Sequence, residues 1–194
     1  MDRRRDRNIG TPARKSPLAP ALLSLGALAL SGCSSLGLGG GGDTAALACP
    51  KVAIVRDLSE VTQFRPGGGR DLTDVVSRAA LADFSGNCEY ASDGVTVNVN
   101  LFLVAERGPA LQGNQASYRY FVAVAKPGED RPSSKSEFDA TITFEPGKPR
   151  AGSREELAPR IPLPKDVNAR DWNIFVGFQL SPEELAFNRA QIGK

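Results

Sequence analysis

The sequence predicts an all-β protein, an immunoglobulin-like antiparallel β-sandwich of about seven strands that ends in a short helix. Apolar and polar residues alternate over several short runs, which is typical of half-buried strands. Gly and Pro turn signals separate these runs, as at Asp93-Gly94 and Lys126-Pro127-Gly128. Residues 49–194 are long enough for one domain with a sizeable core. A β-barrel is the alternative, because the pattern does not assign strands to sheets.

Five runs are interpreted as strands. Residues 95–103 place an apolar side chain at every odd position, and residues 138–144 and 172–180 repeat this alternation at even positions. Residues 118–125 are apolar on both faces apart from Arg119, which indicates a central strand. A short opening strand is expected at residues 52–55.

Two segments are less regular. Residues 71–84 carry apolar side chains at helical spacing, but the strand from Val95 needs an antiparallel partner across the Asp93-Gly94 turn. We therefore expect a strand over residues 80–90 and leave residues 71–79 open. Residues 150–170 contain three prolines, which a continuous central strand excludes, so they are expected to run extended along an edge.

The C-terminal helix is predicted from Ser181-Pro182-Glu183-Glu184-Leu185. Ser at the cap, Pro at the first helical position and Glu three residues after the cap form a capping box. The two carboxylates favour the positive end of the helix dipole, which is the simplest interpretation of their presence.

The N-terminus has the order of a secretory signal peptide: a basic stretch, an apolar run at residues 18–30, and then Leu30-Ser31-Gly32-Cys33, which fits a bacterial lipobox. The apolar run is shorter than the roughly 20 residues that a membrane-spanning helix needs. We therefore interpret residues 1–32 as a lipoprotein signal peptide and Cys33 as the lipidated first residue of the mature protein. Residues 33–48 form a Gly-rich tether, with an end-to-end distance of about 20 Å, before the domain at residues 49–194.

The other two cysteines, Cys49 and Cys88, are expected to form a disulfide, because they are an even pair in an exported protein. Two separate buried thiols are the alternative. If the strands at residues 52–55 and 80–90 are antiparallel neighbours, the bridge lies within one sheet. If they lie in opposite sheets, it crosses the core. No metal site is expected, because two cysteines without histidine leave too few soft ligands.

Charge argues against a nucleic-acid partner. Residues 1–32 hold six of the 24 basic and two of the 22 acidic side chains, so the remaining chain has a formal net charge of −2. We expect attachment to the membrane through the lipid on Cys33. Ser34 is not an acidic inner-membrane retention signal, which favours the outer membrane facing the periplasm. The sequence does not set the oligomeric state.

One loop could bind an anion, because consecutive glycines expose backbone N–H groups between two guanidinium groups. Its residues are Arg65, Gly67, Gly68, Gly69 and Arg70. A surface loop without a ligand explains the same composition.

The chain contains no histidine, so neither a Ser-His-Asp nor a Cys-His catalytic device can be assembled. No cofactor is expected. The sequence favours a non-enzymatic binding or assembly module of the cell envelope, with an envelope protein as a possible partner. The alternative is a cell-wall or glycan hydrolase that uses a pair of carboxylates.

Four segments carry a resemblance to a known group: the lipobox, Cys49-Pro50-Lys51-Val52, Tyr120-Phe121-Val122-Ala123-Val124 and Val176-Gly177-Phe178-Gln179-Leu180-Ser181. Together they resemble uncharacterised lipoproteins of Gram-negative bacteria, and the lipobox is the specific part. The resemblance implies an envelope location and assigns no activity.

Overall fold

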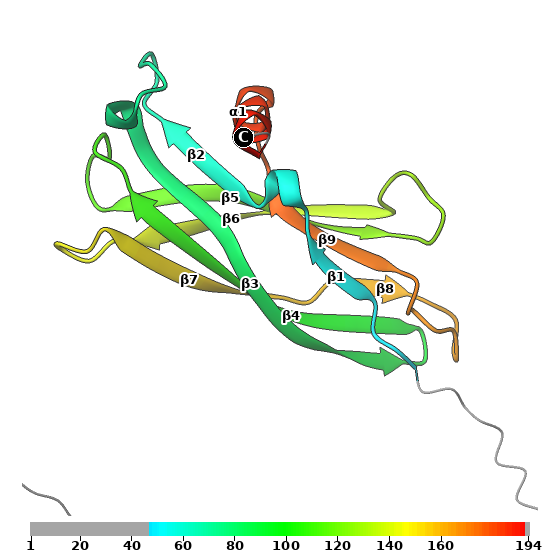
Figure 1. Ribbon diagram of the computed structural model, residues 1–194. Coiled ribbons are helices and arrows are strands. Elements are labelled where there is room, and N and C mark those ends of the chain that lie inside the picture. The colour runs from blue at the N-terminus through cyan, green and yellow to red at the C-terminus, as the bar shows by residue number, and fades with distance from the viewer. Residues whose placement is uncertain (1–46, 193–194) are drawn as a thin grey trace, which may run out of the picture. The chain divides into compact units, whose positions relative to one another are not determined.

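The computed structural model describes residues 47–192 and confirms an all-β sandwich. Within these residues, nine strands form two sheets, and one α-helix follows the last strand (Figure 1). Each sheet places one apolar face against the other, as a sandwich requires.

Sheet A has the strand order β1-β9-β5-β6. Its short first strand pairs in parallel with β9, and the other pairs are antiparallel. The expected central strand is confirmed, because β5 lies between β9 and β6. The bounds are β1 (Lys51–Ile54), β5 (Gln115–Ala125), β6 (Ser134–Thr143) and β9 (Asn173–Phe178).

Sheet B has the order β2-β3-β4-β7, and the short β8 pairs with the first residues of β4. All its pairs are antiparallel. Its strands are β2 (Glu60–Phe64), β3 (Val75–Ala91), β4 (Gly94–Arg107), β7 (Arg150–Leu157) and β8 (Arg160–Pro162). Two 3₁₀ turns flank β2, η1 (Arg56–Leu58) and η2 (Leu72–Asp74).

The sandwich does not confirm the immunoglobulin-like connectivity. In an immunoglobulin constant domain the last strand pairs with the strand that precedes it. Here the last strand, β9, lies between β1 and β5 instead. Two strands also exceed the expected seven, β2 and the separate β8.

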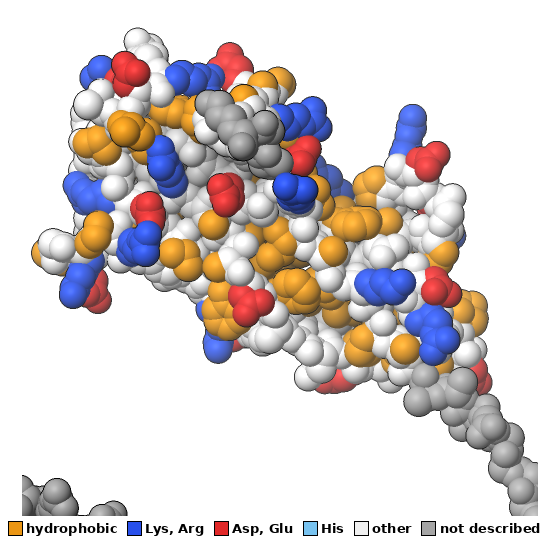
Figure 2. Space-filling view, in the orientation of Figure 1, with side chains coloured by type: hydrophobic (Ala, Val, Ile, Leu, Met, Phe, Trp, Pro, Cys, Tyr) orange, Lys and Arg blue, Asp and Glu red, His pale blue; other side chains and the backbone are white. Residues whose placement is uncertain are grey.

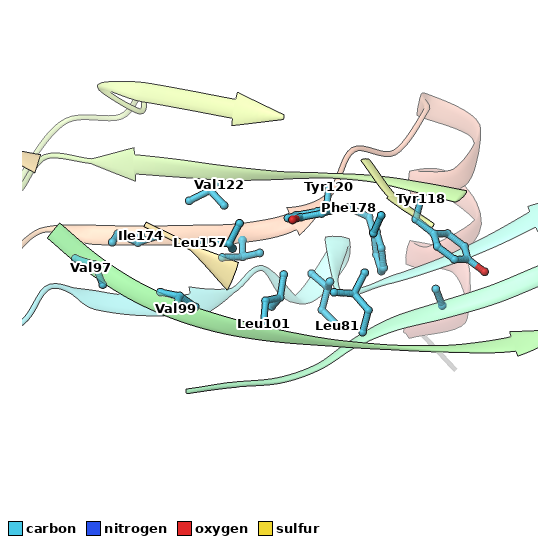
Figure 3. Packing of buried hydrophobic residues seen from close by; sticks show 14 of the residues in the cluster. Leu81, Val97, Val99, Leu101, Tyr118, Tyr120, Val122, Leu157, Ile174 and Phe178 are labelled. Atoms are coloured by element: carbon cyan, nitrogen blue, oxygen red, sulfur yellow. The ribbon is translucent and has the colours of Figure 1, made fainter. Parts of the chain in front are cut away.

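The core lies between the two sheets and draws on both (Figure 3). Val97, Val99 and Leu101 from β4 face Tyr120, Val122 and Ile174 from sheet A. All six are at least 95% buried. Their alternation along each strand is the pattern that the sequence displays.

A bulge and a half-buried outer face explain why β3 shows no regular period of two in sequence, since Val76 and Ala80 are half-buried on the face opposite Val75 and Ala79. The pairing of β3 with β4 shifts between Leu81 and Asp83. Before the shift the odd residues from Val75 to Leu81 are buried, and after it the even residues Phe84, Cys88 and Tyr90 pack against the core. The change of phase breaks the period of two, since an extra residue turns the following side chains to the other face. The expected strand at residues 80–90 is confirmed, and the open residues 71–79 divide between η2 and β3.

The proline-rich segment follows the edge of sheet B, as expected. β7 pairs with Val99–Glu106 of β4, and β8 pairs with Gly94–Thr96. Pro159 interrupts the edge between them, and its carbonyl accepts a hydrogen bond from the Val97 amide at 2.9 Å. An edge tolerates proline because its outer N–H groups need no partner.

The disulfide between Cys49 and Cys88 is present, with the two Cα atoms 5.6 Å apart. Of the two geometries considered, the inter-sheet one is found, because β1 pairs with β9 in sheet A while β3 lies in sheet B. The Tyr90 hydroxyl supports the same junction. It donates to the Ala48 carbonyl at 2.7 Å and accepts from the Ala169 amide at 2.8 Å.

The C-terminal helix α1 (Pro182–Ile192) begins with the predicted capping box. The Ser181 hydroxyl accepts from the Glu184 amide at 3.2 Å, and the Glu184 carboxylate accepts from the Ser181 amide at 2.8 Å. The Asn188 side chain donates to the Asp57 and Glu60 carbonyls, which holds α1 against η1 and β2.

Replacing both Cys49 and Cys88 with Ser is expected to lower the free energy of unfolding by about 3 to 4 kcal/mol, because the bridge closes a long loop in the unfolded chain. Urea unfolding of the variant and the parent protein measures the difference. A reductant should destabilise the parent protein and leave the variant unchanged. Equal stability of the two proteins would contradict this role.

Stability is also expected to fall in alkaline solution. Burial, followed by the negative charge of Glu155, raises the pKa of Tyr120 to about 12. The unfolded chain loses this proton near pH 10, so the folded state binds it more tightly. The stabilisation is complete below about pH 10 and is lost as the pH rises towards 12. Unfolding measured across this range should show a weaker pH dependence for Tyr120→Phe; an unchanged dependence would contradict the assignment.

Candidate binding site

A pocket of about 490 Å³ opens between β2, β5 and the start of α1, and we call it the β2–β5 pocket. Its size falls in the range of small-ligand sites. It exists because β9 ends at Phe178 while β5 begins at Gln115, so the first residues of β5 have no strand beside them on that side. The lining consists of Val61, Gln63, Ser117, Tyr118, Arg119, Asp139, Phe178, Gln179, Leu180, Ser181 and Glu184.

A polar network at the pocket joins the two sheets. The Gln63 side chain donates to the Ser117 carbonyl at 2.9 Å and accepts from the Ser77 hydroxyl at 3.0 Å. Ser77 is fully buried, so this hydrogen bond satisfies a group that water does not reach. The network thereby fixes β2 and β3 of sheet B against β5 of sheet A.

The Tyr118 hydroxyl lies beside this network. Tyr118 is 2% exposed, and its oxygen has no hydrogen-bond partner among the described residues. Figure 3 shows this oxygen directed away from the other labelled core residues. Burial raises the pKa of Tyr118, and the Ser77 hydroxyl, which lies nearby but donates its hydrogen bond to Gln63, opposes that rise.

The charged side chains that line the pocket already have hydrogen-bond or ion-pair partners within the chain. Arg119 donates through Nε to Asp139 at 3.1 Å, on the exposed face of sheet A. Glu184 caps its own helix. Both carboxylates of the pocket therefore have structural partners, and neither is held in the apolar surroundings that a general acid needs.

The arrangement suits recognition of a neutral polar group. The neutral polar side chains Gln63, Ser117, Gln179 and Ser181 each make a hydrogen bond within the chain and keep further donor or acceptor capacity. Val61, Phe178 and Leu180 provide apolar surface. Figure 2 shows Lys and Arg interspersed with Asp and Glu over the face that it displays. A ligand with hydroxyl or amide groups and an apolar face matches this lining better than a highly charged one.

The loop considered for anion binding has its two arginines engaged elsewhere. Arg65 donates to the buried Asp74 carboxylate at 2.5 Å. Arg70 donates to Glu183 at 3.1 Å, and its guanidinium group lies over the rings of Phe64 and Phe187. Anion binding by Arg65, Gly67, Gly68, Gly69 and Arg70 stays a prediction, since an anion would compete with both carboxylates.

A second groove, of about 400 Å³, lies between β6 and the break that separates β7 from β8. We call it the β6–β8 groove. Its lining consists of Val122, Val124, Ser134, Ser136, Phe138 and residues 156–160. Neither pocket was indicated by a motif, because each is built from strands far apart in sequence.

The predicted signal peptide at residues 1–32 and the predicted lipidation site Cys33 lie outside the described residues. Among residues 47–192, no cluster of acidic, Cys or His side chains could hold a metal ion. The one helix of that part of the chain is not long and apolar enough to cross a membrane.

Two substitutions at the pocket test which buried polar groups are stabilised by a hydrogen bond. Gln63→Ala is expected to lower the free energy of unfolding by about 1 to 3 kcal/mol, because it leaves the Ser77 hydroxyl unpaired. Tyr118→Phe is the matched control, and it should leave stability unchanged or raised by about 1 kcal/mol, because it removes a buried hydroxyl without a partner. Urea unfolding measures both. A Tyr118→Phe protein that is less stable than Gln63→Ala would contradict this description.

Comparisons with protein-family models, with curated proteins and with solved structures find no match. Function is therefore inferred from the residues of this chain alone.

Proposed function

We propose that this protein is a lipid-anchored lipoprotein of the cell envelope whose β-sandwich binds another envelope component. The Cys49–Cys88 disulfide is the observation that carries the proposal. Structural disulfides persist in oxidising compartments outside the cytoplasm. The bridge therefore supports export, which the N-terminal signal pattern predicts.

The position of the disulfide supports a tethered domain. The described chain starts at Leu47, next to the turn between β3 and β4 (Figure 1). Cys49 fixes this first segment to β3. Lipid on Cys33 and a tether of about 20 Å would hold this end of the sandwich nearest the bilayer, in our proposal the outer membrane facing the periplasm.

The β2–β5 pocket lies away from that end. β1 and β9 begin together at the pairing of Lys51 with Asn173, near the tether, while the pocket forms where β9 ends at Phe178. A domain attached in this way presents its pocket to the aqueous compartment. We infer that the pocket takes a neutral polar group of an envelope component.

A carboxylate-based hydrolase is the less favoured function. Asp139 and Glu184 line one pocket, but Asp139 pairs with Arg119 and Glu184 caps α1. A glycoside hydrolase needs one carboxyl group free to donate a proton and another free to attack or to activate water. The contacts of these two residues favour binding over acid–base chemistry.

Cys33→Ser is expected to abolish incorporation of labelled palmitate and to leave the precursor uncleaved, because serine offers no thiol for acylation. Metabolic labelling and the size of the protein on a gel measure both effects. Ser34→Ala is the matched control and should be labelled and processed normally. A Cys33→Ser protein that is labelled and processed would refute lipidation. Fractionation of the parent protein with inner-membrane markers would refute the outer-membrane location alone.

A further inference from the structure

The outer edge of sheet A is open along β6. β6 pairs with β5 from Ser134 to Thr143, and no strand of the described chain pairs with its other side. Backbone N–H and C=O groups along such an edge are available to another strand. β6 is ten residues long, which is longer than a typical protected edge strand.

The first half of β6 is also exposed on its inner face. Ser134, Ser136 and Phe138 point towards sheet B, yet all three are exposed, because the β6–β8 groove separates them from the β7–β8 segment. Phe138 stacks on Tyr120 with ring centroids 5.4 Å apart and is still 39% exposed. This half of the edge therefore combines unpaired backbone with uncovered apolar surface.

The outer-facing charges of this half are self-complementary. Lys135 and Glu137 lie symmetrically on either side of Ser136. In an antiparallel pair of two β6 strands with a two-fold axis at Ser136, Lys135 faces the partner's Glu137, and the same contact occurs twice. Opposite charges directly across a strand pair are stabilising, whereas like charges are destabilising. A register centred on Glu137, Phe138 or Asp139 places acidic side chains opposite each other.

We propose that two copies of this protein associate through their β6 edges in this register, so that sheet A continues across the dimer. The partner's Phe138 then lies opposite Ser134 on the inner face, at the mouth of the β6–β8 groove. The groove offers Val122, Val124 and Leu157 as apolar surface for that ring. In the single copy, the Lys135 ammonium group contacts Glu137 at 3.1 Å and Gln179 at 2.5 Å and lies over the Phe121 ring. In the dimer it turns from Gln179 towards the partner's Glu137 and gains a second carboxylate.

A cysteine on the two-fold axis tests the register. Ser136→Cys in the full chain should form a disulfide with the same residue of a second copy under mild oxidation, because directly opposite side chains have Cβ atoms about 5 Å apart. Ser134→Cys is the matched control. Its equivalents would lie about 13 Å apart along the paired strands, so it should remain uncrosslinked. Peptide mapping would confirm that the new bridge joins residue 136 to residue 136.

Charge reversal in the Ser136→Cys background tests the complementarity. Lys135→Glu should reduce the crosslinked fraction about fivefold, because it places like charges opposite each other twice. Adding Glu137→Lys should restore it, since the two opposite-charge contacts return with reversed signs. The proposal is overturned if Ser136→Cys does not crosslink or if Ser134→Cys crosslinks equally well. It is also overturned if adding Glu137→Lys to Lys135→Glu does not restore the crosslinked fraction. Peptide mapping distinguishes a bridge between the two copies of residue 136 from one at Cys33, so this test remains valid even if Cys33 is found not to carry lipid.

Discussion

The covalent link between Cys49 and Cys88 is the constraint on which the start of the fold depends. β1 has only four residues, lies at an edge and pairs in parallel with β9 alone. Such a strand holds few hydrogen bonds of its own. The disulfide and the Tyr90 hydroxyl fix its beginning to β3 and to the loop before β9. β1 is thereby held beside β9, which pairs with β5 through a ladder of its own.

The strands that could be predicted are those whose burial is uniform along their length. β4 and β9 keep one face buried throughout, and β5 is covered on both faces from Tyr120 to Ala125, so their sequences show the pattern directly. β3 could not be recognised over its whole length, because its bulge changes which residues face the core. β2 has a single strongly buried residue, Val61, so its five residues show no clear alternation. It is a strand because it pairs with β3, and the sequence of β2 alone does not show that pairing. Strand order depends on such pairings and has no local signal.

The candidate site could not be predicted for the same reason. Gln63, Ser77 and Tyr118 come from three strands in two sheets, and none belongs to a motif. The sequence of the loop at residues 65–70 suggested an anion site, but its glycines and arginines also have a structural explanation. A Cβ atom on Gly68 or Gly69 would lie about 3 Å from the Asp74 carboxylate, so the glycines allow the loop to close over the buried Asp74, which pairs with the exposed Arg65. Asp74, four residues beyond the loop, was the signal that the two arginines are not both free.

The inter-sheet bridge also determines how the domain carries mechanical load. Tension applied through the chain before Leu47 reaches Cys49 first, and the disulfide transmits it to β3 before it reaches β1. β3 is paired with β4 along almost its full length, so the force is shared over a long ladder instead of peeling a four-residue strand from an edge. A domain pulled at this end therefore resists extension at its strongest hairpin, and the short parallel strand is shielded from the load.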